Sequence, residues 1–298
     1  MNKFVSPFRY PGGKLKVVDY IKRLFEVNDL MDGTYIEPYA GGASVALTLL
    51  FSEYASRIKI NDIDRSIYAF WHSVLEETED LCRMISDTPV TMDVWQVQRD
   101  VQVRKADAGL LELGFSTFFL NRANRSGILS GGVIGGKNQD GKWKIDARYN
   151  KADLIERIES VAEYKDRIEL TSMDAVELIK RYKRAPKAKT FCYLDPPYYV
   201  KGRDLYLNYY TDDDHRAIAK AIKKYKGKWI ISYDAVPFIS DLYKEYRQKE
   251  YYLSYSAGNP AKGKEIIVYS DGLLVPETEI CKMGTGGRDC FTNNRSQQ

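Results

Sequence analysis

The sequence contains few of the side chains that bind metals or form cross-links. Its 298 residues include 4 cysteines and 2 histidines. No C-x-x-C pair occurs among these residues, which are Cys82, Cys192, Cys281, Cys290, His72 and His215. Structural zinc sites need four such ligands at short spacings. The sequence therefore argues against a metal site and indicates reduced thiols, with Cys192 buried in a strand.

Long hydrophobic runs and a strong charge bias are also missing. The N-terminal segment MNKFVSPFRYPGGK lacks the apolar core of a secretion signal, and no apolar run approaches the length of about 20 residues that spans a membrane. The formal net charge is only +4, from 45 Lys+Arg and 41 Asp+Glu. With 44% hydrophobic residues, the chain can bury the core of one large domain with an insert, or of two domains. We expect a folded cytoplasmic protein with no membrane partner.

Short apolar runs alternate with helical patterns over most of the chain. Nearly continuous apolar or β-branched runs, typical of parallel strands covered on both faces, lie at 34–39, 57–61, 167–170, 190–195 and 228–233. Helical patterns lie at 43–54, 63–78, 173–182 and 212–225. This alternation predicts an α/β fold with helices on both faces of the sheet. Two last strands, at 250–257 and 264–270, are expected to form a hairpin at one sheet edge.

The segment from about Trp71 to Tyr164 interrupts the alternation, and we interpret it as an inserted domain. Two long helical stretches lead into the glycine-rich tract SGILSGGVIGGKNQDGKW. Within that tract, Asp140-Gly141 is the two-residue turn signal of a β-hairpin. The expected division is a sheet domain at 1–70 and 164–282, a helical insert with a β-hairpin at 71–163, and a fraying tail at 283–298.

A glycine-containing turn follows the first expected strand and opens a helix in EPYAGGASVAL, residues 37–47. Glycines let backbone N–H groups approach a ligand, and open α/β sheets place a nucleotide-like cofactor at this end of the first strand. An ordinary tight turn is the alternative. The spacing does not fit G-x-G-x-x-G, which weighs against a nicotinamide cofactor. Asp62 lies about twenty residues after the glycines, where an acid can bind ribose hydroxyls, whereas Asp64 fits the N-cap of the next helix.

The tetrapeptide Asp195-Pro196-Pro197-Tyr198 follows the strand at 190–195. The prolines restrict the backbone, so that the Asp195 carboxylate and the Pro196 carbonyl can point the same way. Two adjacent acceptors match an exocyclic amino group, and Tyr198 offers a flat face for a heteroaromatic ring. By chance this tetrapeptide would occur in about one in a thousand chains of this length, so a pure turn is the weaker explanation.

With these motifs in this order, the chain resembles the Dam-type (alpha-class) family of DNA adenine-N6 methyltransferases, which use S-adenosyl-L-methionine and carry a Rossmann-like methyltransferase sheet with an inserted target-recognition domain. PFRYPGGK, YIEPYAGG, IKINDID and LTSMDAVEL resemble its cofactor motifs. The resemblance implies cofactor contacts from Tyr10, Lys14, Glu37, Pro38, Ala40, Gly41, Gly42, Asp62, Ile63 and Asp174. It also implies that Asp195, Pro196, Pro197 and Tyr198 are catalytic.

The resemblance further implies a mechanism. The target adenine is flipped out of the duplex at a cost of a few kcal/mol and stacks on Tyr198, while Asp195 and the Pro196 carbonyl bind its amino group. The sequence has no Pro-Cys dipeptide, which weighs against cytosine C5 chemistry. Asp in the tetrapeptide favours DNA over the RNA and glutamine-amide substrates of Asn-Pro-Pro-Tyr enzymes. Those substrates stay open as alternatives, as does a non-catalytic DNA-binding module.

Residues 121–150 carry six basic and two acidic side chains, a net charge of +4 that equals the net charge of the whole chain. Basic charge on a loop favours phosphate contact with double-stranded DNA, and a solvated surface loop is the alternative. FLNR at 119–122 resembles the start of the family's recognition hairpin. Arg and Asn side chains can read bases in the major groove, so the candidate DNA contacts are Arg122, Asn124, Arg125, Ser126 and Lys137.

One departure from the family concerns the recognised sequence. GATC-methylating relatives carry an aromatic residue followed by Asn-Gly where this chain has Arg125-Ser126-Gly127. This difference weighs against GATC as the target.

We expect the protein to be a monomer.

Overall fold

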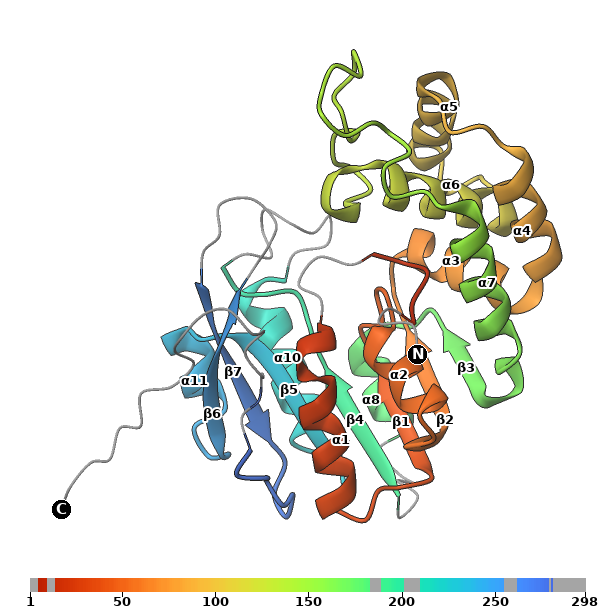
Figure 1. The fold of residues 1–298 in the computed structure, drawn as a ribbon. Coiled ribbons are helices and arrows are strands. Elements are labelled where there is room, and N and C mark those ends of the chain that lie inside the picture. Colours follow the sequence, from red (N-terminus) through yellow and green to blue (C-terminus); the bar gives the residue numbers. More distant parts are fainter. Residues whose placement is uncertain are drawn as a thin grey trace.

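The computed structural model describes residues 5–9, 14–182, 189–200, 210–254, 262–278 and 280. They form an α/β domain and a mainly helical part that lies beyond one end of its sheet (Figure 1). The tail at 283–298, for which fraying was expected, lies outside the described residues. None of the described helices has the length and apolar character needed to cross a membrane.

The α/β domain is built on a seven-stranded sheet of order β3-β2-β1-β4-β5-β7-β6. The strands are β1 (Gly33–Glu37), β2 (Ala55–Asn61), β3 (Ile168–Thr171), β4 (Thr190–Leu194), β5 (Lys228–Asp234), β6 (Gln248–Ser254) and β7 (Lys262–Tyr269). The first five are parallel, and β7 runs antiparallel to both β5 and β6. The five parallel strands and the antiparallel pair at one edge confirm the expectation from the sequence.

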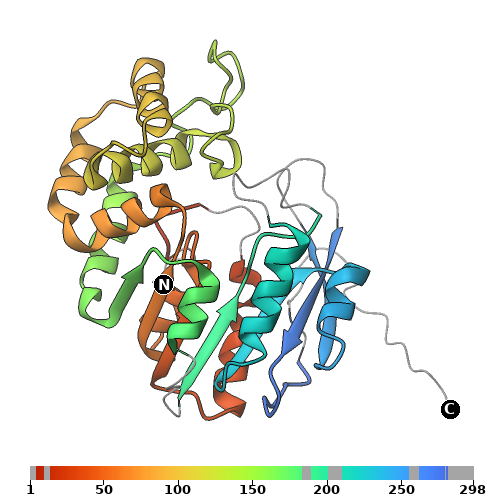
Figure 2. The same ribbon diagram turned by 180° about the vertical axis from the view of Figure 1, so that it is seen from behind.

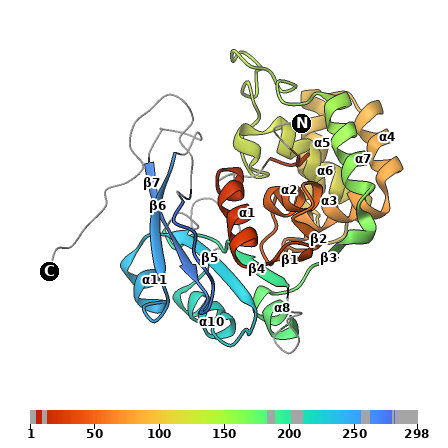
Figure 3. The ribbon, with the colours of Figure 1, turned by 60° about the horizontal axis from the view of Figure 1, so that its bottom comes forward.

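Helices cover both faces of the sheet, as predicted (Figures 1, 2 and 3). Successive residues of a strand point to opposite faces, so Phe191 and Tyr193 of β4 join one apolar core cluster and Cys192 and Leu194 the other. The sheet's helices are η1 (Lys14–Val17), α1 (Val18–Val27), α2 (Ser44–Phe51), α8 (Ala175–Tyr182), α10 (Asp212–Ile222) and α11 (Pro237–Leu242). The core side chains of α1 and α2 lie in the first cluster, and those of α8, α10 and α11 lie in the second.

The inserted part is helical and shares a core with the sheet domain. Its helices are α3 (Arg65–Glu76), α4 (Thr78–Asp87), α5 (Met92–Val103), α6 (Leu110–Ala123), η2 (Arg125–Gly127), α7 (Lys151–Ala162) and η3 (Lys165–Arg167). One apolar cluster contains side chains from both parts, including Leu47 of α2 and Phe118 of α6. The expected boundary at 70/71 falls inside α3, so the insert continues a helix of the sheet domain.

The expected β-hairpin at Asp140-Gly141 is wrong. Residues 128–150, all of which the structure describes, form turns without a strand, and an isolated bridge joins Asn124 to Val133. Glycines weaken strands, and here the Gln139 side chain binds the carbonyls of Ile134 and Gly136 and the N–H of Ile145. The tract is therefore a loop held together by one internal amide side chain.

Replacing Gly114 with alanine tests the close packing of α3 against α6. A Cβ at Gly114 would meet Ser73 Oγ and would lie 2.6 Å from the carbonyl oxygen of Ala69. The helices would have to separate, so Gly114→Ala should lower the free energy of unfolding by about 1–3 kcal/mol. Gly132→Ala is the control, because a Cβ there meets nothing within 4 Å. Equal urea unfolding free energies for the two variants would contradict this packing.

Candidate active site

The candidate site lies where the strand order reverses. Strand β1 has β2 on one side and β4 on the other, and open α/β sheets bind ligands at the carboxyl ends of the strands at such a point. The glycine turn follows β1 and the Asp-Pro-Pro-Tyr segment follows β4. Ile36 and Cys192 pair across these strands, so the chain leaves both strands at the same level. The topology therefore brings the two predicted motifs together.

The glycine turn is held by its surroundings in a left-handed conformation. Gly41 has φ 45° and Ala43, which precedes α2, has φ 46°. The Ala40 N–H donates to the Asn61 carbonyl at 2.9 Å. The indole N–H of Trp71 donates to the Gly41 carbonyl at 2.8 Å, and Ser6 Oγ donates to the Gly42 carbonyl at 2.6 Å. The turn is thus fixed by the end of β2, by α3 and by the N-terminal segment.

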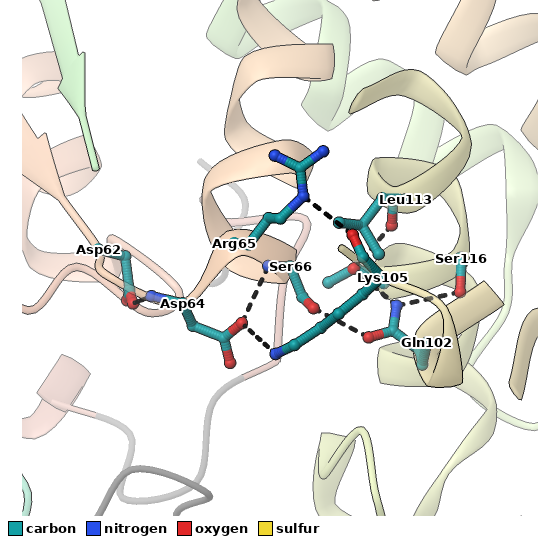
Figure 4. A network of polar contacts seen from close by, with 9 residues as sticks. Asp62, Asp64, Arg65, Ser66, Gln102, Lys105, Leu113 and Ser116 are labelled. Atoms are coloured by element: carbon teal, nitrogen blue, oxygen red, sulfur yellow. Dashed lines mark hydrogen bonds and ion pairs between the residues drawn. The ribbon is translucent and has the colours of Figure 1, made fainter. Parts of the chain in front are cut away.

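Asp62 and Asp64 form different sets of hydrogen bonds (Figure 4). Asp64 caps α3 by accepting a hydrogen bond from the Ser66 N–H at 2.9 Å, and it pairs with Lys105 at 3.2 Å. Asp62 accepts hydrogen bonds from the backbone N–H groups of Gly41 and Asp64, both at 3.0 Å. Burial raises the pKa of Asp62 to about 7 although these two hydrogen bonds oppose the shift. The N-cap prediction for Asp64 is confirmed.

Other predicted cofactor contacts lie around the same turn. Ile63 is 52% exposed beside Asp62, and the Pro38 carbonyl accepts a hydrogen bond from Asn61. Asp174 is exposed, and its Oδ1 accepts hydrogen bonds from the N–H groups of Val176 and Glu177 at the start of α8. Tyr10 lies outside the described residues.

Glu37 ends β1 with an almost fully buried carboxyl group. No described residue forms a hydrogen bond with its Oε2 atom. Burial, together with the charge of Asp195, raises the pKa of Glu37 well above its ordinary value, while a hydrogen bond from the Ala46 backbone opposes the shift. A buried polar atom without a partner is costly. Oε2 is therefore an acceptor at the strand end to which the described residues offer no donor.

The Asp195 carboxylate is pinned through one of its oxygens. Oδ1 accepts a hydrogen bond from Ser232 Oγ at 2.7 Å and lies 3.1 Å from Lys14 Nζ. Within the described ranges, no hydrogen bond reaches Oδ2, and the Asp195 side chain is 22% exposed. Burial raises the pKa of Asp195, and Lys14 opposes the shift. One oxygen is therefore held in place while the other can accept a hydrogen bond from a substrate.

A second carboxylate anchors the backbone of this segment. Asp234, at the end of β5, accepts hydrogen bonds from the N–H groups of Tyr199 and Val200, both at 2.8 Å. Hydrogen bonds to an ionised acceptor are stronger than neutral ones. The segment is thus fixed by proline stiffness and by Asp234. The sequence analysis missed Asp234, although an acid directly after an apolar strand was a readable signal.

Lys14 occupies the centre of a polar cluster beneath the segment. Its ammonium group lies 2.6 Å from the Tyr198 hydroxyl and 3.2 Å from Glu265 of β7. Burial opposes its charge, but Asp195, Tyr193 and Glu265 raise the pKa of Lys14 well above its ordinary value. The Tyr198 ring is buried. The sequence analysis missed both Ser232 and Glu265, which lie inside apolar strands.

Tyr210 is a further residue that the sequence analysis missed. Its hydroxyl lies 3.0 Å from the hydroxyl of Tyr39 in the glycine turn. Burial raises the pKa of Tyr210 to about 12, and the charges of Asp174, Asp214 and Asp62 contribute. The Tyr210 hydroxyl therefore lies close enough to Asp174 and Asp62, two predicted cofactor contacts, to interact with their charges.

Two of the predicted DNA contacts prove to have structural roles. Asn124 is fully buried; it binds the carbonyls of Ile128 and Leu129 and accepts a hydrogen bond from Trp95. The expectation that Asn124 contacts DNA is therefore wrong, because its side chain is occupied inside the protein. Arg122 donates hydrogen bonds to the carbonyls of Arg148 and Pro7. Burial lowers the pKa of Arg122 to about 10, and Arg9 adds to the shift.

The remaining candidates lie at the surface of the insert. Arg125 and Lys137 are exposed. Ser126 has φ 56° and Gly127 has φ 76°, so the chain makes a tight left-handed turn beside Arg125. A Cβ at Gly127 would lie 2.9 Å from the Arg9 carbonyl. Glycine at 127 is therefore required where the insert meets the N-terminal segment, and the turn presents Arg125 outward.

A sheet with this strand order, a glycine turn after β1 and Asp-Pro-Pro-Tyr after β4 defines a Rossmann-like methyltransferase domain. Residues 10–256 match the model of the D12 class N6 adenine-specific DNA methyltransferases. The chain belongs to this family and is a DNA adenine-N6 methyltransferase. Family membership implies S-adenosylmethionine as the methyl donor and DNA as the substrate.

Individual relatives are distant. The type II methyltransferase M.MjaIII of Methanocaldococcus jannaschii is 24% identical over 242 residues, which cover 74% of this chain and 80% of that protein. Two structures of the rRNA methyltransferase aviRa from Streptomyces viridochromogenes are 11% and 10% identical, with TM-scores of 0.37 and 0.36. They cover 87% and 89% of this chain, and 86% and 87% of the aviRa chains. TM-scores this low do not establish that the two structures share the fold of this chain.

Proposed function

We propose that the site between the glycine turn and the Asp-Pro-Pro-Tyr segment methylates N6 of an adenine extruded from double-stranded DNA. The observation that carries this proposal is the arrangement of Asp195. Its Oδ1 is held by Ser232 and Lys14, and among the described residues Oδ2 and the Pro196 carbonyl have no hydrogen-bond donor. Two adjacent acceptors match the two N–H bonds of an exocyclic amino group.

The residues would act by orienting the amino group and stabilising its charge. S-Adenosylmethionine, when bound, supplies an electrophilic methyl group on a sulfonium sulfur. The adenine amino nitrogen is a weak nucleophile because its lone pair is delocalised into the ring. Hydrogen bonds to Asp195 and Pro196 favour a pyramidal nitrogen and stabilise the positive charge that develops on it. Asp195 Oδ2 is then placed to accept the proton that the nitrogen loses.

The residues predicted to bind the cofactor fit an amino-acid-linked nucleoside. The buried Glu37 Oε2 atom, which no described residue binds, can accept a hydrogen bond from an ammonium group. Asp62 can accept from ribose hydroxyls, and exposed Ile63 offers an apolar surface to a flat base. The backbone of Pro38, Ala40, Gly41 and Gly42 lines the turn, and Asp174 is placed to accept from the adenine amino group of the cofactor.

The titration of Asp62 gives a pH test of cofactor binding. Ribose hydroxyls bind an ionised carboxylate better than a protonated one, and the pKa of Asp62 is about 7. The affinity for S-adenosylmethionine should therefore rise with pH up to about 7 and level off above it, with a slope of up to about tenfold per unit below. Calorimetric titration between pH 5.5 and 8.5 measures this affinity and its slope against pH. Asp62→Asn should remove most of the slope, and an equal slope in that variant would contradict the assignment.

The catalytic role of Asp195 is tested by removing its carboxylate. Asp195→Ala should reduce transfer of labelled methyl groups to duplex DNA by at least about 10²–10³-fold, the range for losing one transition-state contact. Cofactor affinity should stay within about threefold of the wild type. The control is Asp241→Ala, which removes an exposed carboxylate of α11. Competing RNA and a glutamine-containing peptide should acquire no label, and label in either one would contradict the DNA assignment.

The DNA interface is proposed on the exposed surface of the insert, with Arg125, Ser126 and Lys137 as contacts. The loop also presents Trp143, which is 65% exposed and lies between Lys142 and Lys144. Lysines bind phosphates, and aromatic rings stack on exposed bases for about 1–3 kcal/mol each. Arg122 would act indirectly, by holding Pro7 and Arg148.

Salt dependence separates direct phosphate contacts from structural residues. Lys137→Ala should weaken DNA binding and reduce the slope of log affinity against log salt by about one. Lys220→Ala, at an exposed position of α10, is the matched control and should leave the slope unchanged. Fluorescence anisotropy with a labelled duplex at several salt concentrations measures both. Identical slopes for the two variants would remove Lys137 from the interface.

A further inference from the structure

Glu265 of β7 is a fully buried carboxylate that the proposed mechanism does not use. It binds three groups that converge beneath the Asp-Pro-Pro-Tyr segment. Its Oε1 accepts a hydrogen bond from the Tyr198 hydroxyl, and its Oε2 accepts one from the Tyr251 hydroxyl. Oε2 also lies 3.2 Å from the ammonium group of Lys14. A buried charge is stable only with such partners, so the carboxylate is built into this cluster.

The antiparallel insertion of β7 puts this carboxylate at the level of the active site. Glu265 pairs with Asp234 across β5 and β7, and with Tyr251 across β6 and β7. Asp234 holds the backbone N–H groups of Tyr199 and Val200. Two neighbouring carboxylates therefore hold the same segment, one through its backbone and one through the Tyr198 hydroxyl.

We propose that Glu265 is a positioning residue for methyl transfer. It fixes the Tyr198 ring through its hydroxyl, and it fixes the Asp195 carboxylate indirectly through the Lys14 ammonium group that the two carboxylates share. This inference rests on the proposed function, which assigns Asp195 to the target adenine, and on the expectation from the sequence that the same base stacks on Tyr198. It adds a residue more than sixty positions beyond the tetrapeptide to the machinery of the site.

The charge of Glu265 also acts on Asp195. The charge of Lys14 lowers the pKa of Asp195, and the charge of Glu265 raises it. The titratable groups that interact electrostatically with Asp195 are Lys14, Tyr35, Glu37, Tyr193, Tyr251 and Glu265. Removing the negative charge of Glu265 removes a contribution that raises the pKa of Asp195, so Asp195 should stay ionised to lower pH.

Two substitutions separate the charge of Glu265 from its placement. Glu265→Gln keeps the shape and removes the charge, whereas Glu265→Asp keeps the charge and retracts the carboxylate by one methylene. Single-turnover methyl transfer should slow about 10–100-fold in both, the range for partners that orient the ligands of a metal site. The acid limb of the pH–rate profile should move to lower pH only in Glu265→Gln. Glu250→Gln, in an exposed ion pair with Lys264 on the neighbouring strand, should change neither quantity.

A second measurement does not depend on activity. Hydrogen exchange of the peptide that spans 191–200 should be faster in Glu265→Gln and Glu265→Asp than in the wild type and Glu250→Gln, because the segment loses an anchor. Faster exchange, slower transfer and the displaced acid limb together support the inference. Unchanged rates and an unmoved limb would overturn it while the proposed function stands. If the wild type transfers no methyl group to DNA, the proposed function fails, and unchanged exchange at 191–200 then overturns the positioning role separately.

Discussion

The active site depends on one buried positive charge. Lys14 comes from the start of the described N-terminal helical turn, and its ammonium group meets side chains from β7 and from the segment after β4. A buried ammonium group is stable only where acceptors surround it, and those acceptors are then held in turn. Lys14 therefore ties the N-terminal segment, the Asp-Pro-Pro-Tyr segment and the antiparallel edge of the sheet into one arrangement. The geometry of Asp195 follows from this constraint as much as from the prolines.

The chain uses acids at strand ends for different purposes, and hydrogen bonding distinguishes them. Asp64 and Asp174 accept from the first N–H groups of a helix, which is the role of an N-cap. Asp234 accepts from two N–H groups of a loop. Asp195 and Glu37 each keep an oxygen that no described residue binds. Asp64 and Asp234 hold the structure through backbone N–H groups, whereas the open oxygens of Asp195 and Glu37 can each accept a hydrogen bond from a ligand.

The sequence predicted Asp62, Asp195 and the glycine turn as parts of the site, and it missed Ser232, Glu265 and Asp234. Asp62, Asp195 and the glycine turn stand at the ends of apolar runs, where parallel strands meet a ligand, and the structure brings them together. Ser232 lies inside an apolar run and Glu265 stands at the start of one, so their role appears only once the order of β5, β7 and β6 is known. That order cannot be read from a hairpin signal, because such a signal does not tell which of the two strands joins the sheet.

The same limit applies to the insert. Asp140-Gly141 is a turn signal, but the flanking glycines offer no alternating apolar face, and a loop held by Gln139 forms instead of a hairpin. Asn124 has the chemistry of a base contact, yet Trp95 and two carbonyls occupy its side chain. Residue type and local spacing identify what a side chain is able to bind. Whether it is free to bind depends on neighbours that are distant in sequence.

Hydrogen bonds join the insert to the N-terminal segment and to the glycine turn of the sheet domain. The Asn121 side chain of α6 accepts a hydrogen bond from the Arg9 N–H at 2.8 Å and donates one to the Arg9 carbonyl. Trp71 of α3 donates to the glycine turn. The end of α6, where the proposed DNA surface begins, is therefore hydrogen-bonded to the N-terminal segment, and α3 is hydrogen-bonded to the turn that follows β1. The DNA surface and the cofactor site that we propose are therefore linked by hydrogen bonds, because Ser6 of the N-terminal segment binds the glycine turn and Pro7 and Arg9 bind α6.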